Sequence, residues 1–305
     1  MSAVLSGLTK YVDEQRLPLI SKLGLDAKSA REFELMTGVK GETALNLIDV
    51  EGYFQDGHNC GWNDSGSTKF TQRNMKPASI KIETSICQNK MQEYWMNYQV
   101  QVGAGRKNLP FEEEICNKLV DNVNEKVEKL IWQGNTASTG DMSFAEGLIR
   151  LLDQTTGATG GAVNVTAASS ATIYERVLAV YRAIPAASLK SARIYVSIAD
   201  FRDLVLEVTA KNLFHYQRDV DEKFEMILPA TNTLVKGVAG LEGADTIVAL
   251  VPEHTFYGCD LAGDKEEFKI WYSEDNDEYR IRIAFICGVQ FAYPSEAVIN
   301  HKAEA

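Results

Sequence analysis

The sequence predicts an α+β protein in which one long amphipathic helix separates a strand-rich first third from a mixed domain of helices and strands. Apolar residues recur at helical spacing between about residues 108 and 134. Short alternating segments, typical of strands, precede that helix. After residue 155, helical and strand patterns follow one another, which is typical of helices packed on a mixed sheet.

The composition is that of a folded globular protein. Of the 305 residues, 45% are hydrophobic and 24% are charged, which argues against a disordered, fibrous or membrane chain. The length allows one large domain or two smaller ones. No apolar run approaches the roughly 18 residues that a membrane-spanning helix needs, and the amino terminus lacks the pattern of a secretory signal. We therefore expect a cytoplasmic protein that contacts no membrane.

Charge and cysteine content restrict the partners and the redox state. The formal net charge is -11, whereas proteins that grip nucleic acid neutralise phosphates with Lys and Arg, so tight DNA binding is not expected. An acidic surface remains compatible with enclosing DNA. Five widely spaced cysteines, an odd number without a CxxC pair, favour buried reduced thiols over disulfides or zinc. They are Cys60, Cys87, Cys116, Cys259 and Cys287.

The first sixty residues predict an arm with two short helices and a weak core. Val4, Leu8 and Val12 share one face of the first helix. For the second helix, Asp26 is the candidate N-cap, and Gly38 is placed to end it. We expect this arm to pack on something else.

A loop and a hairpin are predicted next. Residues 52–67 are rich in Gly, Asn, Asp and Ser, which is loop chemistry. Residues 68–84 contain two extended pieces around residues 75–78, and Ile80 and Ile82 alternate with charged residues. The pattern predicts a hairpin with little apolar surface of its own.

The strongest helical pattern is "NLPFEEEICNKLVDNVNEKVEKLIWQG". Asn108 is a candidate N-cap, Pro110 lies in the first turn, and Gly134 can close the helix. At ~1.5 Å per residue, such a helix is about 37 Å long, enough for a structural spine. Its apolar stripe is Phe111, Ile115, Leu119, Val123, Val127 and Leu130.

The second half begins with a Gly, Thr and Ala-rich linker, "QTTGATGGAVNVTAASS". A helix carrying Ile173 to Ile184 ends before Pro185, and Asp200 can cap a second helix that carries Leu204. The predicted strands are "ARIYVSI", "DTIVALV" and the two arms of a hairpin in "EFKIWYSEDNDEYRIRIAFICG". No internal repeat or heptad array is visible.

Three motifs that resemble ligand sites are better explained as turns. The acidic run 274–278 lacks the central Gly of an EF-hand loop, so we interpret it as a hairpin turn, and we interpret Asp260 and Asp264 in the same way. The "GATGG" segment has no following Lys. The GxxGxxG spacing of Gly237, Gly240 and Gly243 is not followed by a predicted helix, so these glycines are expected to ease turns.

No catalytic, cofactor-binding or metal-ligating residue is predicted, and no cofactor. His58 and Cys60 are close in sequence, but two ligands do not make a zinc site. The other histidines, His215, His254 and His301, are scattered, and no GxSxG elbow is present. The 42 Asp and Glu residues could place a carboxylate pair anywhere, but the sequence favours no particular pair.

The order of the parts resembles the major capsid proteins of tailed double-stranded DNA phages of the Hong Kong ninety-seven type. The phrases that carry the resemblance are "LPFEEEI", "LIWQGN" and "FAEGLIRLLD", followed by a mixed α/β region. The stretch from "VPEHTFYGCDLAGDKEEFKIWYSEDNDEYRIRIAFICGVQFAYPSEAVIN" is similar to the carboxy-terminal strands of that family. The resemblance spans most of the chain and contains no catalytic signature.

The resemblance implies five parts. They are an N-arm (1–60), an E-loop hairpin that reaches onto a neighbouring subunit (61–84), a P-domain (85–154) with the spine helix 108–134, an A-domain (155–285) and carboxy-terminal strands returning toward the P-domain (286–305).

It also implies a structural protein without catalytic activity. The subunits would form pentamers and hexamers, assemble in the host cytoplasm, and enclose double-stranded DNA in the virion without specific binding. Portal, scaffold and decoration proteins are the expected partners. Because only about sixty residues precede the hairpin, the scaffold is expected to be a separate protein, or the chain a processed form. Lys69, Lys76 and Lys81 lie where some relatives crosslink, but exposed strand-edge lysines are the expectation here.

Three alternatives remain. An encapsulin-type shell would enclose a cargo enzyme rather than DNA. A soluble α/β hydrolase would act through an unrecognised carboxylate pair. A tail or decoration component would self-associate into tubes or cap an existing shell.

Overall fold

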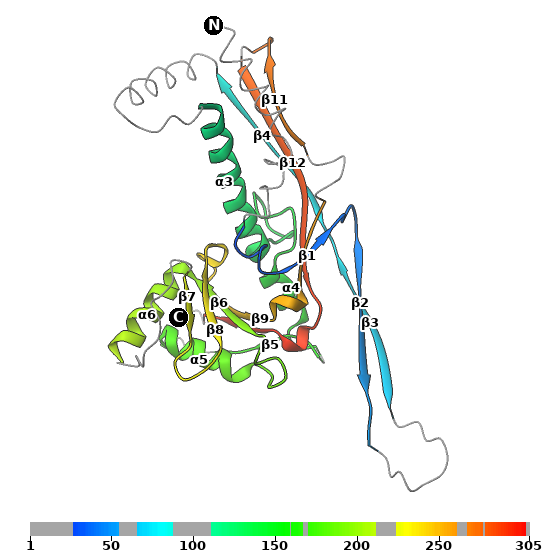
Figure 1. Cartoon of the computed structure of the whole chain (residues 1–305), viewed down its shortest axis with the longest axis vertical. Coiled ribbons are helices and arrows are strands. Elements are labelled where there is room, and N and C mark those ends of the chain that lie inside the picture. Colours follow the sequence, from blue (N-terminus) through cyan, green and yellow to red (C-terminus); the bar gives the residue numbers. More distant parts are fainter. Residues whose placement is uncertain are drawn as a thin grey trace.

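The computed structural model describes residues 27–54, 66–87, 111–158, 160–166, 170–211, 224–260, 267–276 and 278–302. This part of the chain contains two sheets, a protruding two-stranded hairpin, one long helix and three shorter helices (Figure 1). The predicted α+β class is confirmed. The predicted first helix, Asp26, Asn108, Pro110, His58, Cys60, His215 and Asp264 lie outside the described residues.

The first sheet has five strands and is centred on the long strand β12 (Glu278–Phe291). Strand β4 (Ala78–Cys87) pairs with one edge of β12, and β11 (Glu267–Ser273) and β10 (Thr255–Cys259) pair in turn with the other edge. Strand β1 (Glu34–Thr37) runs parallel to β10 at the outside. The acidic turn between β11 and β12 confirms the predicted hairpin.

Helix α3 (Phe111–Gln133) runs beside this sheet (Figure 1) and confirms the predicted long helix within the described residues. Its buried positions, among them Cys116, Val120, Val123 and Val127, recur at three- and four-residue spacing and form one stripe in the core. Ile115 and Leu119, predicted in that stripe, are only partly buried and lie at its margin. Helix α4 (Leu148–Thr155) follows.

The second sheet has six strands in the order β5-β13-β9-β6-β8-β7. Helices α5 (Ile173–Ala183) and α6 (Ile198–Ala210) pack on it and on each other (Figure 1). The strands are β5 (Val163–Asn164), β6 (Arg193–Ser197), β7 (Glu225–Ile227), β8 (Leu234–Val238), β9 (Thr246–Leu250) and β13 (Val298–His301). Three short 3-10 turns complete the described elements: η1 (Ala239–Leu241), η2 (Pro252–His254) and η3 (Pro294–Glu296).

The helix boundaries in this domain follow local capping chemistry. Thr172 and Glu175 form a capping box at the start of α5. The predicted cap of α6 is wrong: Ser197, not Asp200, occupies the N-cap, and its hydroxyl accepts a hydrogen bond from the Asp200 backbone N–H at 3.0 Å.

The predicted helix from Asp26 to Gly38 is also wrong. Residues 27–33 form irregular turns, and residues 34–37 form strand β1. Pairing with β10 supplies β1 with backbone hydrogen bonds that no local pattern reveals. Gly38 has a φ of +76°, so it ends a strand rather than a helix.

The turn segment 27–33 packs into the junction between the two halves of the molecule, as predicted for the arm. Trp132 of α3 donates from Nε1 to the Ser29 hydroxyl at 2.7 Å, and that hydroxyl donates to the Glu128 carboxylate at 2.5 Å. The Phe33 ring lies 6.0 Å from that of Trp132 and 6.2 Å from that of Tyr195 on β6, in edge contacts. The segment therefore contacts both the long helix and the second sheet.

A carboxylate in the same segment binds the second sheet directly. Glu32 accepts from the Tyr195 hydroxyl at 3.0 Å and pairs with Arg193 at 3.3 Å and with Lys236. Lys236 is also 2.7 Å from Glu225 of β7, so the buried ammonium has two acidic partners.

The predicted pairing within residues 68–84 is wrong. Strand β3 (Ser67–Met75) pairs with β2 (Thr43–Glu51), whereas β4 pairs with β12, about 200 residues away in the chain. The link between β3 and β4 crosses the first sheet where Gly258 and Gly288 face each other. A Cβ on Gly288 would lie 2.9 Å from the Pro77 Cα, so only glycine admits this crossing.

Two groups of strands connect regions of the chain that the resemblance assigns to different domains. Strand β11 and the first part of β12, predicted in the A-domain, pair within the first sheet beside β4. Strand β13, predicted to return toward the P-domain, pairs with β9 and β5 in the second sheet. The proposed domain names remain predictions, but residues 267–285 belong structurally with α3.

The glycine interpretation is correct for two residues of three, because Gly240 lies in the 3-10 turn η1 and Gly243 in a turn, whereas Gly237 lies in a strand. Gly243 has a φ of +80° in a turn. Gly237 lies within β8, where an added Cβ would be 3.1 Å from the Phe201 Cβ, and Gly240 packs directly on Trp132. Both glycines permit close packing, Gly237 within a strand and Gly240 within the turn η1.

Candidate assembly surface

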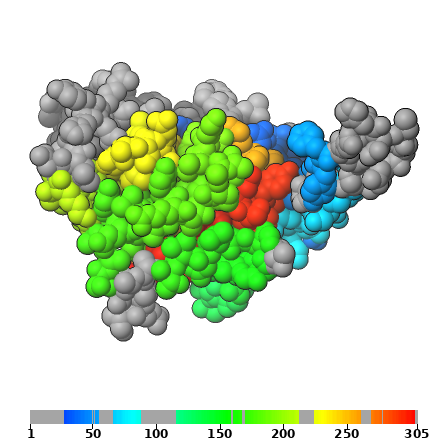
Figure 2. Space-filling model, turned by 90° about the horizontal axis from the view of Figure 1, so that it is seen from below, coloured from blue at the N-terminus to red at the C-terminus, as the bar shows by residue number. Residues whose placement is uncertain are grey.

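The β2–β3 hairpin is largely exposed beyond its root. Its strands pair only with each other along most of their length, and the hairpin projects from one edge of the molecule (Figures 1 and 2). An isolated two-stranded hairpin is at best marginally stable in water, because it has no third layer against which to bury a face.

One face of this hairpin carries a cluster of exposed apolar side chains. Ile48 pairs directly with Phe70, and Val50 lies two residues along from Ile48 on the same face. Their exposed fractions are 58% for Ile48, 76% for Phe70 and 67% for Val50. We call Ile48, Val50 and Phe70 the hairpin patch. Adjacent large apolar side chains at such exposure are typical of a surface that another chain covers.

The base of the hairpin is firmly attached to the first sheet. Met75 is fully buried, and a Cβ on Gly258 would lie only 2.5 Å from its Cε. The Arg73 guanidinium lies 4.4 Å from the centre of the Phe291 ring and donates to Gln290 at 3.2 Å. Gln290 in turn donates to the Asn74 carbonyl at 2.8 Å. The hairpin is thus held at its root and exposed beyond it.

Sequence reasoning missed the hairpin patch. In "TALNLIDV", Leu45 and Leu47 are separated by one polar residue, an alternation typical of a strand. In the sequence-based prediction, this segment instead belongs to the arm. Of the predicted lysines, Lys69 lies on β3, Lys76 lies in the link, and Lys81 lies on β4, where it pairs with Glu83 at 3.3 Å. Their lack of crosslinking remains a prediction.

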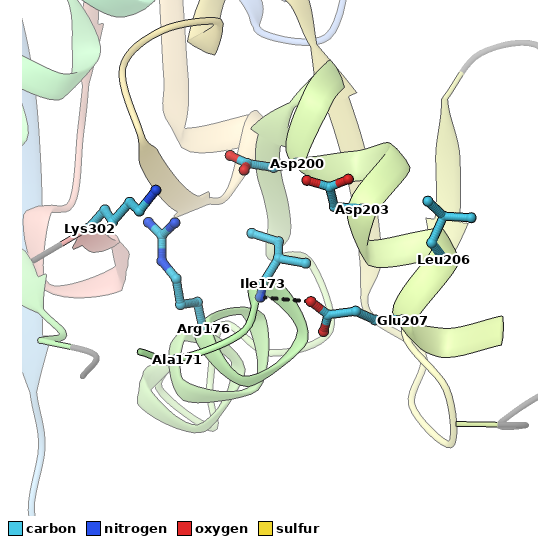
Figure 3. A pocket seen from close by; sticks show the side chains of 8 residues that line it. All are labelled: Ala171, Ile173, Arg176, Asp200, Asp203, Leu206, Glu207 and Lys302. Atoms are coloured by element: carbon cyan, nitrogen blue, oxygen red, sulfur yellow. Dashed lines mark hydrogen bonds between the residues drawn. The ribbon is translucent and has the colours of Figure 1, made fainter. Parts of the chain in front are cut away.

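A cavity of about 340 Å³ between α5 and α6 gathers charged side chains. Asp200, Asp203 and Glu207 lie along one face of α6, opposite Arg176 of α5 (Figure 3). This is the place where a catalytic carboxylate pair could occur. Glu207, however, accepts from the backbone N–H groups of Ile173 and Tyr174 at 3.2 and 3.1 Å, so it caps the start of α5.

Arg176 in this cavity also has structural partners. Its Nε donates to the Asn300 side chain at 2.9 Å, and its Nη2 donates to the Asp245 carbonyl at 2.8 Å. Burial lowers the pKa of Arg176 from its usual value, while Asp200 and Asp245 act in the opposite direction. The arrangement joins α5 to the second sheet.

The two described histidines make separate local contacts. His254 lies 2.5 Å from Glu296 and against the Tyr293 ring. His301 lies 2.8 Å from Asp153 and 3.1 Å from the Thr246 hydroxyl. Within the described ranges, no three His, Cys, Asp or Glu residues come together as a metal site, and no helix has the length and apolar character to cross a membrane.

Comparison with known proteins finds similarity in structure alone. No family model matches the sequence, and no curated protein does. A chain of the satellite phage P4 procapsid, which includes the size determination protein, is 12% identical with a TM-score of 0.65, covering 94% of this chain and 90% of that one.

Two further particles have similar chains. The capsid of the empty GTA particle gives 10% identity and a TM-score of 0.57, covering 93% of this chain and 90% of that one. The virus-like particle from Pyrococcus furiosus gives 9% identity and a TM-score of 0.54, covering 94% and 98%. The chain therefore has the fold of the tailed-phage capsid proteins that its sequence resembles.

Proposed function

We propose that the chain is the major capsid protein of a tailed phage, a structural subunit without catalytic activity that assembles into an icosahedral shell. The observation that carries this proposal is the hairpin patch, which projects from a capsid-type fold and has no covering layer among the described residues. A second copy of the chain is the proposed partner of the patch.

The energetics favour assembly through many modest contacts. Burying a large apolar side chain contributes roughly 1.5–3 kcal/mol, so the three side chains of the patch contribute about 5 kcal/mol before the costs of association. One such contact is weak alone. In a closed symmetric shell every subunit gives and receives the contact, so the total becomes large.

The proposed contents and partners follow from the same fold. Pentamers and hexamers would enclose double-stranded DNA in the virion, and the acidic chain would hold that DNA without gripping it. Portal, scaffold and decoration proteins are proposed partners, and assembly is proposed to occur in the host cytoplasm. The structural roles of Glu207 and Arg176 support the absence of catalysis in the α5–α6 cavity.

An encapsulin-type shell around protein cargo is the second candidate, because it would be built from the same fold. Particles purified from the natural host separate the two candidates. Double-stranded DNA protected from nuclease inside the particles supports a phage capsid. A single copurifying enzyme without protected DNA supports the cargo shell instead.

The test of the hairpin contact compares Phe70→Ser with Thr71→Ser, which changes the next, exposed residue on the opposite face. Size-exclusion chromatography and negative-stain electron microscopy measure assembly over a concentration series. We expect Phe70→Ser to raise the concentration needed for closed shells or capsomer rings by at least about tenfold, and Thr71→Ser to behave as the wild type.

Circular dichroism and the midpoint of thermal unfolding control for folding, since Phe70 makes few contacts within its own chain. Equal assembly by both variants would exclude the patch as the contact. A wild-type chain that stays a monomer or dimer at every concentration, even with a coexpressed scaffold, would overturn the capsid proposal and favour the hydrolase.

A further inference from the structure

Two cysteines face each other across the first sheet. Cys259 ends β10, and its directly opposed residue on β12 is Cys287. The next pair along is Gly258 with Gly288, which lies beneath the crossing of the β3–β4 link. The cysteine pair is therefore next to the root of the protruding hairpin.

Both thiols point into the same core. Side chains alternate along a strand, and Cys259 and Cys287 have the same orientation as the opposed core pair Tyr257 and Val289. Their exposed fractions are 5% and 2%. Neither is in a disulfide in the structure, and the same holds for Cys87 and Cys116.

The register suits a disulfide. Directly opposed residues in an antiparallel pair have Cα atoms about 4.5 or 5.5 Å apart, depending on the hydrogen-bonding position. A disulfide is compatible with Cα separations of about 4.4–6.8 Å. Both alternatives lie within that range, so the strands need no large displacement to form the bond.

Burial keeps the reduced pair unreactive while the sheet is closed. Burial raises the pKa of Cys287 to about 12, and the nearby Cys259 acts in the same direction. Because the thiolate is the reactive form, a buried thiol with so high a pKa exchanges slowly. Oxidation therefore depends on transient opening of the sheet or on prolonged exposure to an oxidant.

We propose that Cys259 and Cys287 form a reversible intrasubunit disulfide that locks β10 to β12 at the root of the hairpin when the protein meets a disulfide oxidant. One cysteine, as its thiolate, attacks a small-molecule disulfide and displaces one thiol. The second cysteine then attacks the resulting mixed disulfide and displaces the other thiol. Overall, the protein loses two protons and two electrons, and the oxidant is reduced to two thiols.

In an assembled particle, the disulfide would form after the shell leaves its host. Only this consequence of the disulfide rests on the proposed function. Cytosolic thiols stay reduced, whereas extracellular conditions favour disulfides. A shell released from its host would gain the bond after assembly. The bond would stabilise the platform on which Met75 and Pro77 anchor the hairpin, without changing any contact between subunits.

The test uses the full-length chain, reduced and then incubated with oxidised glutathione under native conditions at mildly alkaline pH. Remaining thiols are alkylated in denaturant, and peptides are identified by mass spectrometry. We expect a linked pair of peptides containing Cys259 and Cys287, lighter by two hydrogens than the reduced pair. The midpoint of thermal unfolding should rise by about 5 °C and return after reduction.

Cysteine-to-serine variants identify which thiols cause the rise in the unfolding midpoint. Cys259→Ser and Cys287→Ser should each abolish the rise, whereas Cys116→Ser, at another buried core position, should keep it. If a serine variant folds poorly, the proposal is still tested by the wild type, through the reversible rise in its unfolding midpoint and its linked peptides. Recovery of Cys259 and Cys287 as free thiols or separate glutathione adducts would overturn the disulfide. A linked pair without a change in the unfolding midpoint would overturn the lock. Neither result bears on whether the chain assembles.

Discussion

Glu128 joins helix α3 to the turn segment 27–33 at the junction between the two halves of the molecule. Its carboxylate is 5% exposed and accepts hydrogen bonds from the Ser29 backbone N–H at 3.0 Å and from the Ser29 hydroxyl. Burial raises the pKa of Glu128, and these bonds together with Trp132 oppose the rise. Glu32, the other carboxylate near it, adds to the rise.

The sign of the pH dependence follows from that shift. Because the folded-state pKa is above the unfolded value of about 4.3, the folded protein binds the proton more tightly. The resulting stabilisation is complete below the unfolded pKa and is lost as the pH rises through the folded pKa. Over this window, the wild type should lose free energy of unfolding with increasing pH relative to Glu128→Gln, which has no titrating group at this position.

Urea unfolding of the two proteins across pH 4 to 8 measures this difference. Titrating groups that do not interact with Glu128 are common to both proteins, so their contributions to the pH dependence cancel in the comparison. A difference in unfolding free energy that stays constant with pH would contradict the role of Glu128.

At the scale of elements, the sequence pattern predicted those elements whose hydrogen bonds join residues close together in the chain. Helix α3 follows from the recurrence of Val120, Val123 and Val127, and the β11–β12 hairpin follows from alternation on both sides of a polar turn. Both elements obtain their hydrogen bonds from neighbours in sequence, so their periodicity is sufficient.

Long-range pairing could not be predicted in the same way. Strand β4 has alternating residues but pairs with β12, and β1 forms only because β10 lies beside it. The hairpin patch was missed for this reason, since assigning β3 to β4 left β2 without a partner. From sequence alone, strands can be paired only with their neighbours along the chain. Gly258 and Gly288, which allow the β3–β4 link to cross the first sheet, face each other only once that sheet has formed.

The hairpin root offers a prediction at this scale. Met75→Ala removes a fully buried side chain that packs on Gly258, so we expect the free energy of unfolding to fall by about 2–5 kcal/mol. Hydrogen exchange of β2 and β3 should accelerate more than that of β9 in the second sheet. Lys76→Ala, at the adjacent exposed residue, is the control and should change neither quantity. Equal acceleration in β9 would show that Met75 supports the whole fold rather than the hairpin.

At the scale of the whole molecule, net charge opposes the contacts that the hairpin favours. Each chain carries a formal charge of -11, so subunits repel one another on approach. Salt screens this repulsion, because the Debye length falls from about 30 Å at 0.01 M to about 10 Å at 0.1 M. The apolar contact of the hairpin patch is not weakened by such screening.

Assembly should therefore increase with salt. Light scattering at a fixed protein concentration should show a larger assembled fraction at about 0.3 M NaCl than at about 0.01 M, where the Debye length is long. Phe70→Ser should remain largely unassembled at both, since screening removes repulsion but supplies no attraction. If the assembled fraction of the wild type instead falls as salt is added, attractive ion pairs between subunits dominate the interface, and the patch is secondary to them.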